Sequence, residues 1–199
     1  MHRSFRLNTV VVPLLAFAAA LAVGRGADAQ VKAFGISGEG VAPMGVPLPG
    51  EGSRPHWIVG VATHLGLHYG EGSVITHDID VFDPAAGRIA GNFGSGVPFT
   101  FVGANGDKLV CEYGRDADGN FVGEYELQIL EILPGGALVV EAAWVADFVV
   151  RPDLSTGRFE GVTGRWTMFA WSEPFVLGSS DPLNYGWQGI GRLQFPQGN

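Results

Sequence analysis

The chain has 199 residues, of which 46% are hydrophobic and 16% charged, and its formal net charge is −8. This length and composition are typical of one globular domain with a sizeable core. The acidic balance repels phosphate backbones and anionic lipid surfaces, so we expect no nucleic-acid partner and no membrane-surface role.

The first 29 residues have the features of an export signal. Arg3 and Arg6 precede an apolar run from Val10 to Val23, and small residues follow at 27–29, where a signal peptidase would cleave. The run is shorter than the roughly 20 apolar residues of a membrane helix. The sequence therefore predicts a signal peptide over 1–29 and a secreted protein, periplasmic or extracellular, with no membrane insertion after cleavage.

Residues 30–55 differ in composition from the rest of the chain. They are rich in glycine, and the prolines at 43, 47, 49 and 55 disfavour long central strands and helices. We therefore expect an extended Gly/Pro-rich arm over 30–55 and a β-barrel domain over 56–199.

After Trp57 the sequence has the pattern of strands and hairpins. Short runs of valine, isoleucine, threonine and aromatic residues alternate with turn sequences, and no segment sustains helical periodicity. The predicted strands are 57–65, 73–82, 97–103, 108–114, 121–133, 137–151, 164–172 and 187–195. Successive hairpins of this kind form a meander that closes on itself. The expected fold is all-β, a single antiparallel closed β-barrel of about eight strands with an extended N-terminal arm.

The predicted strand 137–151 is apolar on both faces. Trp144 and Phe148 lie on one face, and Val145 and Val149 lie on the other. The outer face of such a strand in a closed barrel needs a second burial partner. The partner is either another subunit, in a homo-oligomer such as a dimer or trimer, or the N-terminal arm folded across the outside.

Three connectors carry a resemblance to a known family. Residues 156–164, with the sequence TGRFEGVTG, form a tight connector in which glycines allow unusual backbone angles and Phe159 can plug a barrel end. Together with 63–66 and 104–107, this segment resembles connectors of the allene oxide cyclase-like and dirigent-like barrels, a group with bacterial secreted members of unknown function. The resemblance implies an eight-stranded barrel, often dimeric or trimeric, with a largely apolar interior in which some members guide reactive intermediates. The matched positions are connectors, so the resemblance assigns no catalytic residue.

His77 is the candidate polar group of the barrel interior. Ser73, Ile75 and Ile79 share its face if the strand 73–82 is regular. A histidine on an apolar face of a cavity can serve as a handle for a ligand or as a general base. The alternative is a core histidine that only satisfies its own hydrogen bonds.

Two aromatic residues complete the candidate ligand site. Tyr113 shares its strand face with Cys111, the single cysteine, which we interpret as a buried thiol. Trp171 precedes the loop 173–185 and would line a rim, whereas Trp144 and Trp187 fit the inward pattern.

A metal site would use His64 and His68. The two are four residues apart, and on a regular strand that spacing separates them by about 13 Å. We therefore expect no metal, and no sequence motif indicates a cofactor.

The residues leave three functions open. The first is a non-catalytic secreted barrel that binds a small apolar ligand or a partner surface. The second is an isomerase or cyclase of the allene oxide cyclase or dirigent type, which confines a reactive intermediate in the barrel. The third is a structural assembly protein. No nucleophile elbow, phosphate-binding loop or zinc-protease motif occurs in the sequence.

Overall fold

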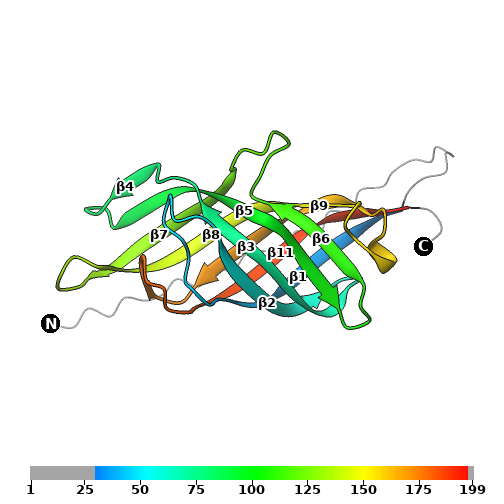
Figure 1. Cartoon of the computed structure of the whole chain (residues 1–199), viewed down its shortest axis with the longest axis horizontal. Coiled ribbons are helices and arrows are strands. Elements are labelled where there is room, and N and C mark those ends of the chain that lie inside the picture. The colour runs from blue at the N-terminus through cyan, green and yellow to red at the C-terminus, as the bar shows by residue number, and fades with distance from the viewer. Residues whose placement is uncertain (1–29, 197–199) are drawn as a thin grey trace.

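The computed structural model describes residues 30–196, which form eleven strands and one short 3-10 helix (Figure 1). The strands are β1 (Gln30–Ala42), β2 (Arg54–Ala62), β3 (Gly66–Thr76), β4 (Val81–Asp83), β5 (Arg88–Gly103), β6 (Lys108–Tyr113), β7 (Gly123–Ile132), β8 (Leu138–Val150), β9 (Thr163–Ser172), β10 (Phe175–Val176) and β11 (Leu183–Phe195). The helix is η1 (Gly157–Phe159). The predicted signal peptide lies outside the described residues. Over residues 30–196, no helix is long and apolar enough to cross a membrane.

The strands pair in a closed ring, and every pairing is antiparallel. The ring runs from β1 through β2, β3, β5, β6, β8 and β9 to β11, which pairs with β1. Between β5 and β8, β6 occupies one end and β7 the other, and both run in the same direction. They act as one interrupted strand, so the barrel is eight strands around, as predicted. In Figure 1 the hairpins at β4 and at the β7–β8 turn extend beyond one end of the barrel.

The start of the barrel differs from the sequence-based expectation. The arm predicted over 30–55 is extended, but its first part, Gln30–Ala42, is the barrel strand β1, hydrogen-bonded to β2 and β11. Only 43–53 lies outside the strands. Two of the glycines that suggested an arm, Gly38 and Gly40, are needed where neighbouring groups approach β1 closely, as the Tyr185 ring does at Gly40. Because β1 is part of the barrel, residues 30–42 do not cover the outside of β8, where Val145 and Val149 are exposed.

The barrel is filled with aromatic side chains. Phe148 stacks on Tyr113 at 4.7 Å between ring centroids and on Trp166 at 4.0 Å. At the end near η1, Phe159 is completely buried, and its ring lies 6.1 Å from that of Phe195. This end is therefore closed by packed side chains, and any internal space lies toward the other end.

Candidate functional site

A cavity of about 60 Å³ lies inside the barrel, toward the end where β1 leads into β2. Its wall is apolar except for a few ring atoms, and it is lined by Ala42, Val46, His56, Ile58, Val74, Phe93, Phe99, Phe101, Tyr113, Trp144, Phe148, Met168, Ala170, Leu183, Tyr185 and Trp187. At about 10–15 Å³ for each water-sized group, the space accommodates roughly five such groups. The cavity is thus smaller than the roughly 300–1,000 Å³ of most drug-sized ligand pockets.

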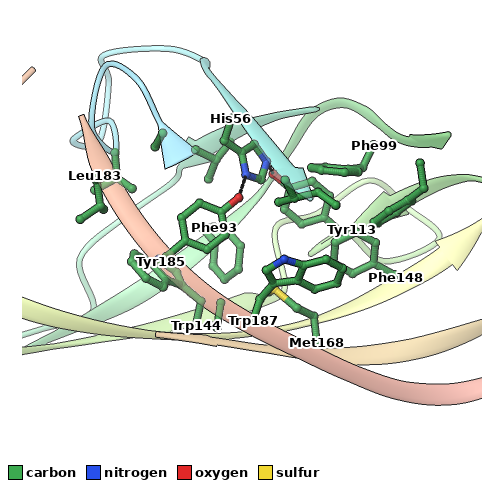
Figure 2. Close-up of a pocket in the computed structure, with 16 residues that line it drawn as sticks. His56, Phe93, Phe99, Tyr113, Trp144, Phe148, Met168, Leu183, Tyr185 and Trp187 are labelled. Atoms are coloured by element: carbon green, nitrogen blue, oxygen red, sulfur yellow. Dashed lines mark hydrogen bonds between the residues drawn. The ribbon is translucent and has the colours of Figure 1, made fainter. Parts of the chain in front are cut away.

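His56 forms the polar centre of this cavity, between two tyrosine hydroxyls (Figure 2). Its Nδ1 lies 2.7 Å from the Tyr185 hydroxyl, and its Nε2 lies 2.8 Å from the Tyr113 hydroxyl. Tyr113 donates its own proton to the backbone oxygen of Ser73 at 2.7 Å. Tyr113 must then accept from the Nε2–H of His56, which leaves Nδ1 to accept from Tyr185. The four groups form one directed chain of hydrogen bonds, from Tyr185 through His56 and Tyr113 to Ser73.

Glycines in the strands next to β2 allow rings to reach His56. Gly40 of β1 pairs with Tyr185 of β11, and the Tyr185 ring occupies the space that a side chain at Gly40 would need. On the other side, Phe99 of β5 lies over Gly72 of β3, which is the partner of His56 in the sheet. The Phe99 and His56 rings meet edge to face at 5.1 Å. The missing side chains thus let aromatic groups cross a neighbouring strand and converge on the histidine.

The titratable groups of the cavity are neutral near pH 7. Burial lowers the pKa of His56 from 6.5 to about 4. Burial also raises the pKa of the Tyr113 and Tyr185 hydroxyls above their ordinary value of 10. A charged ligand would therefore meet no opposite charge on the cavity wall, and burying an unpaired charge costs several kcal/mol. The site is suited to an uncharged molecule.

Residues 43–53, which we call the strap, cover the cavity end of the barrel. Val46 of the strap lines the cavity, and Pro47 is fully buried behind it. Arg54 holds the strap in place: its guanidinium donates to the backbone oxygens of Met44 and Val46 at 2.5 and 3.2 Å. It also pairs with the carboxylate of Glu51 at 2.7 Å.

The strap also has a space on its far side. A second cavity of about 30 Å³ shares Val46, Val74 and Trp144 with the first. Arg54 reaches across to the backbone oxygen of Ser179, in the loop before β11, at 3.4 Å. The two spaces have one strap residue, Val46, in common in their walls.

Only one of the three predicted ligand-site residues lies in the cavity. Tyr113 lines it, next to the buried Cys111, whose thiol pKa burial raises to about 12. His77 does not reach the interior: it is exposed in the segment after β3 and stacks on Phe121 at 4.7 Å. The physical reason is the facing of β3: His68, Gly70 and Val74 are buried, whereas Leu67, Tyr69 and Glu71 are exposed. The face that the sequence assigned to the interior is therefore the opposite one, and β3 ends at Thr76, before His77.

Trp171 lies on the outer surface, 50% exposed, and so does not line the cavity rim. Its ring packs over Gly186 and occupies the space that a side chain there would need. Two further polar residues that line the cavity, His56 and Tyr185, were not predicted as site residues. His56 directly follows Pro55 and precedes the predicted strand start, so no sequence signal marked it as inward-facing.

His64 and His68 do not approach each other as metal ligands would. His64 lies in the β2–β3 turn with a positive φ of 67°, and its Nε2 contacts the backbone oxygen of Ala33 at 3.2 Å. His68 points into the barrel, where its ring packs against Phe101 and Trp187. Within residues 30–196, no three His, Cys, Asp or Glu side chains are grouped to hold a metal ion.

The outside of β2 and β3 carries a second notable feature, an apolar surface that we call the β2–β3 face. It consists of Trp57, Val59, Val61, Leu67 and Tyr69, each about half exposed or more. Val59 pairs with Tyr69 and Val61 with Leu67 across the two strands. Exposed apolar side chains that form a contiguous patch of this kind mark interaction surfaces more often than isolated ones do.

Comparisons with protein-family models, curated proteins and solved structures found no match for this chain. The function is therefore argued from the chemistry of the cavity and of the surface.

Proposed function

We propose that this protein is an exported barrel that binds a small, uncharged, largely apolar molecule in the cavity beside His56. The observation that carries the proposal is a polar centre, His56 with Tyr113 and Tyr185, placed in an otherwise apolar wall. Ligand sites commonly combine apolar walls with a few placed polar groups. Export is supported by the N-terminal sequence, with its basic residues, apolar run and small residues.

The state of the cavity groups favours binding over catalysis. Both ring nitrogens of His56 are engaged by tyrosine hydroxyls, and its low pKa makes it a weak base. An isomerase or cyclase, as the resemblance to allene oxide cyclase-like and dirigent-like barrels implies, would have to act by shape and confinement of its substrate. That function remains the alternative proposal, and it would use the same cavity.

The strap provides the route by which a ligand would enter. In the closed barrel the cavity holds only a molecule of a few heavy atoms. The strap has no strand pairing of its own and is held by the hydrogen bonds of Arg54. Its displacement opens the barrel end without breaking the ring of strands, because β1 and β2 remain paired through Ile36–Val41.

The proposal is tested by filling the cavity. Ala170 lines it and is 6% exposed, so Ala170→Leu places three additional carbons in the space. Ala143→Leu on the exposed face of β8 is the matched control. Benzene, an uncharged apolar probe, should raise the melting temperature of the wild type and of Ala143→Leu, but not that of Ala170→Leu. An equal response of all three proteins, or none in the wild type, would refute the proposal.

A second candidate function, association with another protein surface, is favoured by the β2–β3 face. Leu67 is 70% exposed and Val59 is 60% exposed, although both are apolar. We propose a second copy of this chain as the partner, because the same strip on two copies can pack on itself in a two-fold dimer. Sedimentation of the wild type should show a dimer that Leu67→Lys dissociates. A wild-type monomer at all accessible concentrations would exclude this candidate.

A further inference from the structure

We infer that the ligand of the cavity carries a hydrogen-bond acceptor, such as a carbonyl or ether oxygen, and that the indole N–H of Trp187 is the donor that binds it. This inference rests on the proposed function and specifies the class of its ligand: an uncharged, compact, apolar molecule with one acceptor atom.

The position of Trp187 carries the first step. Trp187 lies in β11, lines the cavity and is only 3% exposed. Its Nε1 is buried and has no hydrogen-bond partner. Figure 2 shows its indole between Tyr185 and Phe148, with the nitrogen on the edge nearer to His56 in this view. A buried donor without a partner has lost its hydrogen bond to water and gained none in return, so an acceptor placed there would bind favourably.

The other polar groups of the cavity have no proton left to donate. Tyr185 donates to His56, His56 donates to Tyr113, and Tyr113 donates to Ser73. Each of these three side chains has a single proton that it can donate, and all three protons are used in the hydrogen bonds that run from Tyr185 to Ser73. The Trp187 indole is thus the donor of the cavity wall that remains for a ligand.

Size and charge restrict the class further. The closed cavity takes roughly five water-sized groups, which corresponds to a small ring or a short branched chain. A carboxylate or an ammonium group is disfavoured, because His56, Tyr113 and Tyr185 are uncharged near pH 7. A small cyclic ketone satisfies all three conditions of size, charge and acceptor.

The experiment compares two probes of nearly the same shape, cyclopentanone and methylenecyclopentane, of which only the ketone has an acceptor. Binding to the full mature protein is measured by NMR, through the indole N–H signals of its tryptophans. Cyclopentanone should move the Trp187 indole proton downfield, whereas methylenecyclopentane should bind with little shift of that signal. This readout in the wild type does not depend on how any variant folds.

Variants then isolate the N–H group. In Trp187→Phe the ratio of ketone affinity to alkene affinity should fall about 10-fold relative to the wild type, the effect of one hydrogen bond. The ratio cancels the different solubilities of the two probes and the loss of ring volume. Trp171→Phe, which removes an indole from the outer surface, is the control and should keep the wild-type ratio.

Two results would overturn the inference, and they differ in what they say of the proposed function. In the first result, both probes bind, but the Trp187 indole signal does not respond to the ketone and the affinity ratio is unchanged in Trp187→Phe. The assigned donor is then wrong, while the binding of apolar molecules stands. If neither probe binds to the wild type, both the inference and the proposed function fail.

Discussion

His56 makes the stability of the barrel depend on pH in a predictable way. The pKa of this histidine falls from 6.5 to about 4 on folding, because its ring is enclosed among Tyr113, Tyr185 and Phe99. Between these two pH values the unfolded chain binds a proton that the folded chain does not. Acidification therefore favours the unfolded state, and stability that is complete above pH 6.5 is lost progressively as the pH falls to about 4.

The size of the effect follows from the shift. At about 1.4 kcal/mol for each pKa unit, a change from 6.5 to about 4 corresponds to about 3 kcal/mol of unfolding free energy. Because the residue keeps some exposed surface, this value is an upper limit. His56→Gln removes the titration but keeps an acceptor for Tyr185 and a donor for Tyr113, so the fold should be retained.

Urea unfolding followed by tryptophan fluorescence at several values between pH 7.5 and 4 measures the effect. The wild type should lose up to about 3 kcal/mol more than His56→Gln over this range. His77→Gln removes a histidine from the exposed segment after β3 and should follow the wild type. Parallel pH profiles of the wild type and His56→Gln would refute the reasoning.

Three further predictions concern the surroundings of the cavity. Tyr113→Phe leaves the Ser73 carbonyl and the His56 Nε2–H without partners, so it should lower the unfolding free energy measured in urea by about 1–3 kcal/mol. Tyr185→Phe removes only one hydrogen bond, the one to His56, and should lower the unfolding free energy by less. Gly70→Ala places a methyl group 2.6 Å from the Phe99 ring and should lower the unfolding free energy by about 1–3 kcal/mol. Gly35→Ala in β1 places its methyl group in open space, so the same measurement should show a loss of less than about 1 kcal/mol. Arg54→Gln should accelerate proteolysis within the strap without changing the circular dichroism of the barrel, and an unchanged cleavage rate would show that Arg54 does not hold the strap.

The barrel could be predicted from the sequence because strands and turns are marked by local sequence patterns. Turn residues and alternation identified most strands after Trp57, although the first half of β5 and the short β10 were not predicted. The closed antiparallel ring is confirmed. The strand β1 was missed because its glycines and the prolines that follow it are unfavourable in an isolated strand. In the barrel, Gly38 makes room for the backbone of β2 and Gly40 for the ring of Tyr185. That requirement comes from strands far away in the sequence.

The candidate site was predicted only in part. Tyr113 lies in the cavity wall, but the sequence-based alternation put His77 on the inward face with Ser73 and Ile75, whereas Val74 of the opposite face lines the cavity and β3 ends before His77. His56 was not recognised because three apolar residues of β2, Trp57, Val59 and Val61, face outward. Alternation alone would therefore assign the wrong face of β2 to the interior. The position of His56 depends on the ring of strand pairings, which one sequence does not specify.

The most direct test of the central claim is a crystal structure of the mature protein under xenon pressure. Xenon binds in dry apolar cavities and needs no specific chemistry. The account predicts a xenon atom inside the barrel, in contact with Phe99 and Trp187 and next to His56, and its loss in Ala170→Leu. Xenon bound only on the outer surface, with the interior of the wild type unoccupied, would contradict the claim that this cavity receives an apolar ligand.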